Sequence, residues 1–297
     1  MNYKKWFLKN TEDLSGKTGA VTGSTGGIGV WLCCYLASLG ANLILLNRSE
    51  TKTNEQITAL KNEFKDIKIQ YIPLDLSDIK SVKAATDILK DNCPDVIIHN
   101  AGAYSIPRYI TDCGFDNVFM INFLSPYYMT KTLLPYLSQK GGRVVAVGSI
   151  AHNYSKTDPE NIDFRNIKAA SKAYGNAKRY LMLSFYKLFE NEKNVTFSIT
   201  HPGITFTNIT AHYPKMIFAV IKHPMKVIFM KPKRAALSVL KGVFCKTEYG
   251  TWYGPRIFDV WGLPNKKHLN TFKNDEVCAV YKTAEECFNK IASFLTE

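Results

Sequence analysis

Short apolar runs alternate with longer stretches of helical spacing through about the first 200 residues of the chain. Runs rich in Val, Ile and Leu that end in glycine or polar residues are typical of buried strands, and the stretches between them suit helices. The strands expected are 18–22, 42–46, 67–74, 95–99, 143–147 and 195–200, and the helices expected are 28–39, 52–64, 79–89, 123–137 and 170–191. This alternation predicts an α/β protein whose parallel sheet is covered by helices on both faces.

The chain changes character after about residue 205. The stretch 213–230 is rich in Ile, Phe, Met and Val, and lysines and prolines interrupt it. Nothing in the sequence has the character of a domain linker, an internal repeat or a low-complexity run. We therefore expect one domain over residues 1–297, with an insertion at approximately 206–235 that covers the functional face.

Composition narrows the class of protein. A chain of 297 residues with 46% hydrophobic and 21% charged residues has the material for a sizeable core and excludes a disordered protein. The net charge of +13 suits a polyanion, an anionic membrane surface or a phosphate-bearing cofactor. The chain lacks a dense stripe of Lys and Arg with interleaved aromatic residues, so we predict no nucleic-acid partner.

The seven cysteines contain no CxxC pair, which argues against a zinc ribbon or a disulfide framework. No His and carboxylate residues have metal-ligand spacing, so we predict no metal. The N-terminal apolar patch Trp6–Leu8 is too short for a signal-peptide core, and no run reaches the roughly 18 apolar residues of a membrane span. These observations together favour a cytoplasmic protein.

The first motif with chemical meaning is the glycine-rich turn TGSTGGIG, residues 22–29, between the first strand and the first helix. Glycines there let the backbone turn tightly and approach a phosphate, while the helix N-terminus offers free N–H groups to an anion. Alone, such a turn is often only a tight connection. The residues expected to hold cofactor phosphates are Gly23, Ser24, Thr25, Gly27, Ile28 and Gly29.

Three further signals follow in order along the chain. Asn100-Ala101-Gly102 comes directly after the fourth strand, and Ser149 comes directly after the fifth. Tyr174 and Lys178 are four residues apart, so they share one face of the long helix. Each signal alone has an ordinary structural explanation. Because ligands of open α/β sheets bind beyond the carboxyl ends of the strands, their joint order predicts one crevice in a Rossmann-type doubly wound sheet.

With these motifs in this order, the sequence resembles the short-chain dehydrogenase/reductase family. The matching segments, which span roughly the first 210 residues, are TGSTGGIG (22–29), NAG (100–102), Asn122 in MINFLSP, Ser149 in VVAVGSIAH, YGNAK (174–178) and HPG (201–203). Three features are similar to the retinol-dehydrogenase-like branch, namely the segment GSIAH, the long stretch before YGNAK and the later segment GTWYGPRIFDVWGLP. Ala177 departs from the serine that many relatives have before the lysine.

The resemblance implies hydride transfer between a nicotinamide cofactor and an alcohol or carbonyl group. A tyrosine with a pKa near 10 is a poor acid or base at neutral pH, and an adjacent lysine ammonium would lower that pKa. We therefore expect Tyr174 to exchange the proton, Lys178 to lower its pKa, and Ser149 to hold the substrate oxygen. By resemblance, Lys178 would also hold the ribose, and Asn122 would complete a proton relay through a water.

The end of the second strand bears on the choice of cofactor. An acidic residue there would bind the ribose hydroxyls of NAD, whereas this chain has Arg48 and Ser49, which suit a 2′-phosphate. The sequence therefore favours NADP(H) over NAD(H). By resemblance, the remaining cofactor contacts are Asp75, Leu76, Asn100, Ala101, Gly102, Tyr174, Lys178, Pro202, Gly203, Ile204 and Thr205.

The apolar stretch 213–230 suggests a lid over a hydrophobic alcohol or carbonyl compound, such as a retinoid, a steroid or a long-chain aldehyde. The same side chains would also suit a core or a dimer contact. A peripheral membrane contact is a third reading, disfavoured because Pro214, Pro224 and Pro232 break the period of an interfacial helix. The resemblance alone implies a homodimer or homotetramer.

Two other functions remain open from the sequence. One is reduction of an activated carbon–carbon double bond, and the other is a non-catalytic dinucleotide-binding sensor or scaffold. The joint presence of Ser149, Tyr174 and Lys178 favours an enzyme, because a binding module has no need of the tyrosine acid.

Overall fold

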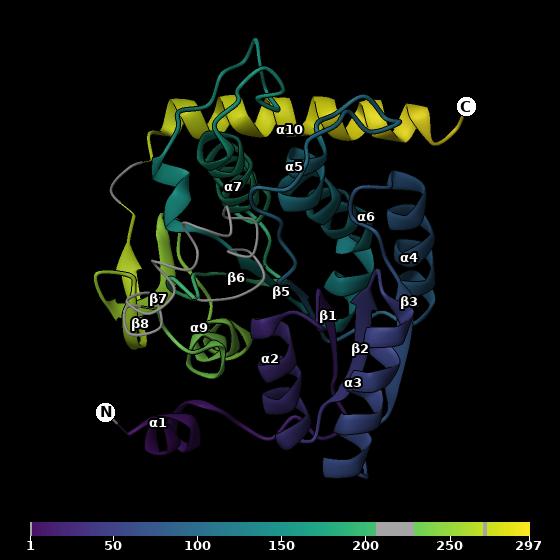
Figure 1. The fold of residues 1–297 in the computed structure, drawn as a ribbon, viewed down its shortest axis with the longest axis vertical. Coiled ribbons are helices and arrows are strands. Elements are labelled where there is room, and N and C mark those ends of the chain that lie inside the picture. The colour runs from purple at the N-terminus through teal and green to yellow at the C-terminus, as the bar shows by residue number, and fades with distance from the viewer. Residues whose placement is uncertain (1, 206–228, 270–271) are drawn as a thin grey trace, which may run out of the picture.

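A sheet of eight strands in the order β3-β2-β1-β4-β5-β6-β7-β8 runs through the molecule (Figure 1). The computed structural model describes residues 2–205, 229–269 and 272–297. The strands are β1 (Thr18–Thr22), β2 (Asn42–Asn47), β3 (Ile69–Pro73), β4 (Val96–His99), β5 (Arg143–Val147), β6 (Thr196–Thr200), β7 (Thr251–Ile257) and β8 (Trp261–His268). Pairing is parallel up to β7, and β8 runs antiparallel to β7. The strand order reverses between β1 and β4, which confirms the doubly wound sheet.

Helices cover both faces of this sheet (Figure 1). The longer helices are α2 (Gly27–Ser38), α3 (Glu50–Glu63), α4 (Ile79–Asp91), α6 (Ser125–Lys140), α7 (Ala170–Leu188), α9 (Pro232–Phe244) and α10 (Asn274–Phe294). Shorter elements are α1 (Tyr3–Asn10), α5 (Asn117–Phe119), a π-helical turn η1 (Met120–Leu124) and a 3-10 turn η2 (Ile150–Asn153). No described helix has both the length and the apolar character needed to cross a membrane.

Two hydrophobic clusters lie on opposite sides of the sheet. Ile97 belongs to the cluster with α4, α6, α7 and α10, whereas its neighbour Ile98 belongs to the cluster with α2 and α9. Both side chains are fully buried. Successive strand side chains point to opposite faces, so a strand buried on both sides must be apolar at every position. This is why the short apolar runs of the sequence identified the central strands correctly.

The structure corrects the expected elements in three places. The helical stretch expected to begin at residue 123 begins at Asn117 and continues through η1 into α6. Pro126 lies in the first turn of α6. The strands β7 and β8 and the helices α1, α9 and α10 were not expected. The expected insertion at 206–235 lies mostly outside the described residues, but Pro232 begins α9 and Ala235 is fully buried, so its last residues belong to the core.

Helix α10 lies across α7 and α6 (Figure 1). Its buried residues are Val277, Val280, Ala284, Cys287 and Ile291, which recur every three or four positions and so form one apolar stripe. All seven cysteines are free thiols, in line with the lack of a disulfide framework in the sequence.

We expect Gly242→Ala to destabilise the protein by about 1–3 kcal/mol, because a Cβ there would lie 2.6 Å from Thr200 Cγ2 and 2.8 Å from Val145 Cγ1. The control is Gly19→Ala, whose Cβ would meet Leu36 at an ordinary 3.4 Å. Urea unfolding measures both variants. Equal stability of the two would show that α9 can move away from the sheet at no cost.

Candidate active site

The glycine-rich turn after β1 has the geometry of an anion cradle. Gly23 has φ +65°, and a Cβ on Gly29 would lie only 2.3 Å from the carbonyl oxygen of Gly23, so both positions require glycine. Helix α2 begins after Gly26, which has no side chain to cap it. The N–H groups of the first turn are therefore available to an anion such as a phosphate.

A cavity of about 420 Å³ extends from this turn along the carboxyl ends of β2, β3 and β4. Twelve of the expected cofactor residues line it, namely Gly23, Thr25, Gly27, Ile28, Gly29, Arg48, Ser49, Asp75, Leu76, Asn100, Ala101 and Gly102. The expected set did not include nine further lining residues, which are Gly26, Leu46, Asn47, Lys52, Leu74, Ala103, Tyr104, Ile106 and Ile121. The glycine turn, the ends of neighbouring strands and the NAG segment thus meet at one crevice, as predicted.

Ser24 is an exception among the expected contacts. Its side chain is fully buried, where its hydroxyl donates to Gln56 at 2.8 Å and accepts from the Asn47 amide at 2.7 Å. These bonds tie the glycine turn to β2 and α3 and take up the hydroxyl. Ser24 is not among the lining residues of the cavity, so its contact with a cofactor stays a prediction.

Two cationic side chains, Arg48 and Lys52, line the cavity at the end of β2. The Arg48 side chain is 79% exposed, and its Nη1 lies 3.8 Å from Asp75 Oδ2. Ser49 caps α3 by accepting from the backbone N–H of Lys52 at 3.4 Å, which places Lys52 in the first turn of that helix. Arginine, lysine and a helix N-terminus together make this end of the cavity electropositive.

Ser149 and Tyr174 meet although they come from different elements. Ser149 caps η2 by accepting from the Ala151 N–H at 3.2 Å, and its side chain lies near enough to Tyr174 to lower the pKa of that tyrosine. The two elements touch directly, since a Cβ on Gly175 would lie 2.3 Å from the carbonyl oxygen of Ala151. Only glycine beside the tyrosine allows so close an approach.

Lys178 lies one turn along α7, with its amine 5.8 Å from the centre of the Tyr174 ring. The Lys178 side chain is buried, and its Nζ donates to the carbonyl oxygen of Val147 at 2.9 Å. A Cβ on Gly102 would lie 3.6 Å from this Nζ, so the lysine borders the NAG segment. The structure therefore brings Ser149, Tyr174 and Lys178 together as the sequence predicted.

The pKa shifts in this cluster differ from the sequence expectation. Burial raises the pKa of Tyr174 to about 12, although the nearby Ser149 works in the opposite direction. Burial also lowers the pKa of Lys178 from 10.5 to about 7. The expected lowering of the tyrosine pKa by the lysine is thus corrected, because removal of both groups from water disfavours their charged forms.

Asn122 lies in the π-helical turn η1, a type of irregularity that is common at functional sites. Its amide accepts from the Ala103 N–H at 3.2 Å and donates to the Ala103 carbonyl at 2.8 Å. A Cβ on Gly102 would lie 2.9 Å from Asn122 Oδ1. Through these contacts Asn122 holds the backbone that follows the NAG segment. Its part in a proton relay through a water stays a prediction.

The HPG segment is held by strands that the sequence did not predict. The His201 ring stacks on Trp252 of β7 with centroids 4.8 Å apart, and its Nε2 lies 3.0 Å from the carbonyl oxygen of Asp259. Gly203 has φ +85°, and a Cβ there would lie 2.8 Å from the Val260 carbonyl. Pro202, Gly203, Ile204 and Thr205 are not among the described lining residues of the cavity, so their contact with a nicotinamide stays a prediction.

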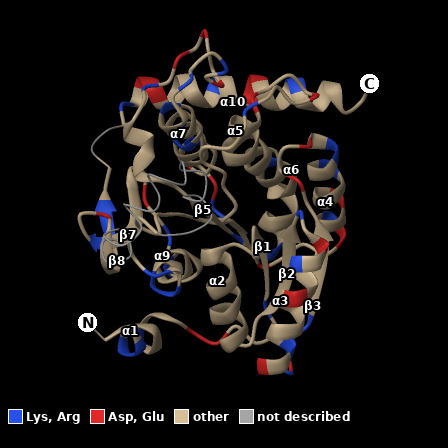
Figure 2. Ribbon diagram, in the orientation of Figure 1, with Lys and Arg blue, Asp and Glu red and all other residues tan. Residues whose placement is uncertain are grey.

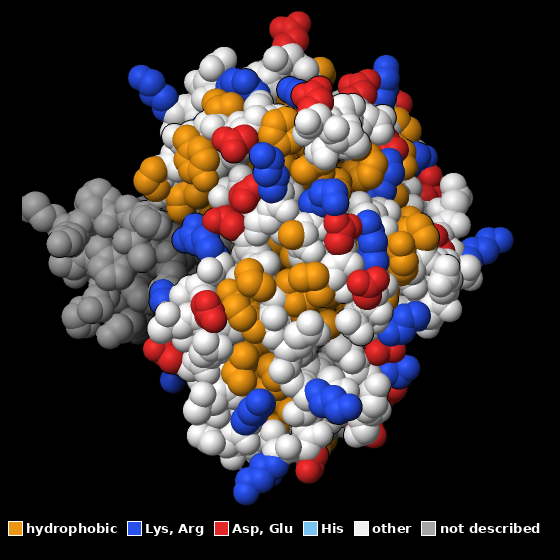
Figure 3. All heavy atoms as spheres, turned by 90° about the vertical axis from the view of Figure 1, so that its right-hand side faces the viewer, with side chains coloured by type: hydrophobic (Ala, Val, Ile, Leu, Met, Phe, Trp, Pro, Cys, Tyr) orange, Lys and Arg blue, Asp and Glu red, His pale blue; other side chains and the backbone are white. Residues whose placement is uncertain are grey.

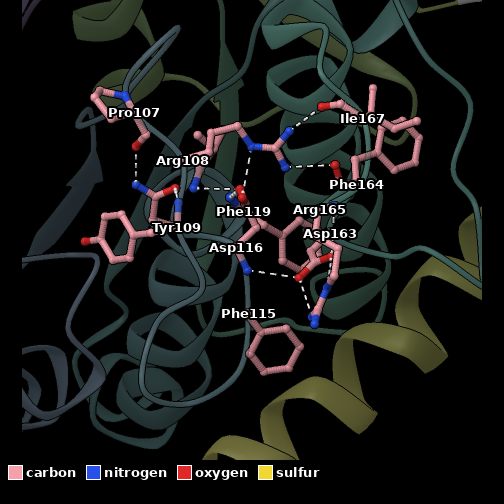
Figure 4. A network of polar contacts seen from close by, with 12 residues as sticks. Pro107, Arg108, Tyr109, Phe115, Asp116, Phe119, Asp163, Phe164, Arg165 and Ile167 are labelled. Atoms are coloured by element: carbon pink, nitrogen blue, oxygen red, sulfur yellow. Dashed lines mark hydrogen bonds and ion pairs between the residues drawn. The ribbon is translucent and has the colours of Figure 1, made fainter.

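A polar network joins the segment after NAG to the stretch before Tyr174 (Figure 4). The Arg108 guanidinium donates to Asp116 at 2.9 Å, to the Phe164 carbonyl at 2.8 Å and to the Ile167 carbonyl at 2.5 Å. The backbone N–H of Asp116 donates to Asp163 at 2.9 Å. Both carboxylates are buried, so these paired charges fix two loops beside the site as one unit. Sequence reasoning missed this network because its members belong to no motif.

These features define a dinucleotide-binding oxidoreductase. Residues 17–217 match the family model described as short chain dehydrogenase. The chain therefore belongs to the short-chain dehydrogenase family, whose members are oxidoreductases that act on alcohols and carbonyl compounds with a nicotinamide dinucleotide.

Named relatives agree with this assignment. An uncharacterised oxidoreductase of Schizosaccharomyces pombe is 30% identical over 258 residues, which cover 81% of this chain and 76% of that protein. Retinol dehydrogenase 13 of Homo sapiens is 30% identical over 205 residues, or 67% of this chain and 62% of that one. Polyprenol dehydrogenase of Mus musculus is 28% identical over 236 residues, or 76% and 70%. These relatives confirm the predicted retinol-dehydrogenase-like branch.

The fold also has solved counterparts. The crystal structure of an uncharacterised protein from Mycobacterium Paratuberculosis has a TM-score of 0.74 at 22% identity and covers 95% of this chain and 96% of that one. At this identity the likeness shows the fold, and it includes the C-terminal elements that the sequence did not predict.

We expect Lys178→Met to lose turnover but to melt at a higher temperature than the wild type at pH 6, by on the order of 5 °C. Burial lowers the pKa of Lys178 from 10.5 to about 7, so below pH 7 the folded chain bears the full cost of a buried charge. That cost shrinks between pH 7 and pH 10.5, where the folded lysine is neutral and the unfolded one still charged. The stabilisation by methionine should shrink over the same range.

Thermal melts at pH 6 and pH 9 measure this effect. The control is Lys187→Met, which removes an exposed lysine of the same helix that pairs with Glu190. A lower melting temperature for Lys178→Met at pH 6 would contradict the argument.

Proposed function

We propose that this protein is an NADP(H)-dependent oxidoreductase that interconverts an alcohol and a ketone or aldehyde on an apolar substrate, with Tyr174 as the acid and base. The observation that carries the proposal is the convergence of Ser149 and Tyr174, whose elements touch at Ala151 and Gly175, with the buried Lys178 beside Tyr174 and the glycine-lined cavity nearby. A binding module without turnover would not need a buried lysine that costs stability.

The cavity offers hydrogen-bond donors that suit the phosphates of a dinucleotide. The free N–H groups of α2 suit the pyrophosphate, and Gly102 lets the ribose come close to Lys178. When bound, the nicotinamide supplies or accepts the hydride. Its contact with Pro202 to Thr205 remains part of the proposal.

The side chains of the protein position the substrate and transfer the proton. Ser149 holds the substrate oxygen at the place where negative charge develops. Tyr174, whose pKa burial raises to about 12, remains protonated at neutral pH and can donate to that oxygen during carbonyl reduction. Alcohol oxidation requires the reverse transfer, so it should accelerate as the pH rises.

Preference for NADP(H) is supported by the charges at the end of β2. Arg48 and Lys52 line the same end of the cavity, and β2 ends in Asn47 without an acidic residue. A phosphate on the adenosine ribose would be paired there with two cations.

An apolar substrate is supported by two relatives whose names are those of apolar alcohols, retinol and polyprenol. The Ile-, Phe- and Met-rich stretch 213–230 would provide the matching wall as a lid, although only its last two residues, Phe229 and Met230, are among the described ones. The cytoplasmic location, the peripheral membrane contact and the homodimer or homotetramer remain predictions.

We expect Tyr174→Phe to lower turnover by about 10²–10⁴-fold and to leave dinucleotide affinity nearly unchanged, because it removes only the proton donor. The absorbance of the reduced nicotinamide, followed with a series of apolar ketones and aldehydes, measures turnover. The control is Tyr136→Phe, on the exposed part of α6. A fully active Tyr174→Phe enzyme would refute the mechanism.

We expect Arg48→Glu to weaken NADPH at least about 10-fold more than NADH, since a carboxylate would repel the 2′-phosphate. Fluorescence titration of both dinucleotides measures the two affinities. The charge-matched control is Lys61→Glu, on an exposed position of α3 away from the cavity. Equal losses for the two cofactors would show that Arg48 does not select between them.

A further inference from the structure

A buried ion pair joins the catalytic helix to α10. Arg179, the residue after Lys178, donates from Nε and Nη2 to the two carboxylate oxygens of Glu276, each at 2.5 Å. The two side chains are only 7% and 20% exposed. Burial alone would raise the pKa of Glu276, but its bonds with Arg179 lower that pKa overall. The pair is therefore charged, bidentate and largely removed from water.

From this pair a short chain of hydrogen bonds reaches the catalytic serine. Arg179 Nη1 donates to the carbonyl oxygen of His152 at 3.2 Å. The backbone N–H of His152 donates to the Ser149 carbonyl at 3.1 Å, and the ring Nδ1 lies 2.7 Å from the same oxygen. Thr157, which follows η2 in the chain, donates to Glu276 at 3.2 Å. One carboxylate thus binds both α7 and the segment that follows Ser149.

Aromatic packing keeps the His152 end of this chain fixed. The imidazole is buried, with Trp252 edge-on at 5.5 Å and Phe272 at 5.4 Å between ring centroids. Movement of the Arg179 guanidinium would therefore be transmitted to η2 rather than absorbed by a mobile side chain.

The contact between Ser149 and Tyr174 needs such a tie. The close approach of Gly175 and Ala151 prevents η2 and α7 from coming nearer, but a steric contact alone does not hold them together. Arg179 supplies the attraction on the same face, just beyond that contact. Because proton transfer is sensitive to errors of about 1 Å, loss of the tie should cost turnover.

We propose that Glu276 is a positioning residue for the Ser149–Tyr174 pair, acting through Arg179 and His152. Glu276 lies beyond the residues 17–217 that match the family model, so here the C-terminal helix contributes to the geometry of the catalytic site. The kinetic consequence rests on the proposed function. The structural consequence, a changed placement of the Ser149 hydroxyl relative to Tyr174, does not.

The first test uses the cofactor-free protein. Tyrosine labelled with ¹³C at Cζ gives one NMR signal for each ring, and Tyr174→Phe assigns the signal of Tyr174. Ser149→Ala defines the shift caused by complete loss of the Ser149 hydroxyl. We expect Glu276→Ala to move the Tyr174 signal in the same direction by about half as much or more, and Glu276→Gln to move it less. A Tyr174 signal that stays in place in folded Glu276→Ala would overturn the proposal.

Matched variants separate positioning from general loss of stability. Glu285→Ala removes a carboxylate from the same helix that binds Lys131 and Tyr127 of α6, so it should leave the Tyr174 signal unchanged. If Glu276→Ala does not fold, the double variant Arg179→Met/Glu276→Leu replaces the buried pair by apolar side chains, a change that proteins often tolerate. It should fold and still shift the Tyr174 signal, and an unshifted signal would again overturn the proposal.

The second test is a kinetic cycle. We expect Glu276→Gln to lower kcat about 10-fold with unchanged dinucleotide affinity, and to lower it less than about 2-fold when Ser149 is already alanine. Equal losses in the two backgrounds would mean that Glu276 does not act through Ser149. If the wild type reduces no carbonyl compound, the proposed function fails, and the NMR test still decides the role of Glu276.

Discussion

The rest of the site depends on one costly feature, the ammonium group of Lys178 inside the protein. Burial lowers its pKa to about 7, and its hydrogen bond to the Val147 carbonyl offsets only part of the loss of water. Opening of the surrounding backbone to water would relieve this cost, so the lysine stays buried only if that backbone resists opening. The close packing of Gly102 against Asn122 and of Gly175 against Ala151 provides that rigidity. The close contacts that keep Lys178 buried therefore also position the groups that would react.

The charged groups around the site fall into two environments. In Figure 2 the Lys and Arg residues are spread over many surface elements, and Figure 3 shows both signs interspersed on one face of the molecule. The pairs that bear on the site are different, because Arg108–Asp116 and Arg179–Glu276 are largely shielded from solvent. Exposed pairs contribute little to stability, whereas a buried, fully hydrogen-bonded pair fixes an orientation. The net charge of +13 thus says less about function than a few buried charges do.

Sequence reasoning succeeded where the cause of a structure is local. Val96-Ile97-Ile98 can only be a strand buried on both faces, and the glycines at 23 and 29 are required by steric contacts within the turn. It failed where the cause is tertiary. Glycine and proline interrupt the pattern of β7 and β8, which exist because they pair with each other and with β6. The raised pKa of Tyr174, the hydrogen bonds of Ser24 and the pairing of Arg179 with a residue 97 positions away have no signature in spacing.

The stacking of His201 on Trp252 has a consequence for how the protein is made. Ribosomes complete β1 to β6, with every residue of the Ser-Tyr-Lys cluster, before β7 and α10 exist. A domain generally folds as a unit, so the HPG segment has no fixed position until β7 has been translated. The catalytic cluster is thus encoded before the residues that support it, and its final geometry has to wait for the last strands and helix.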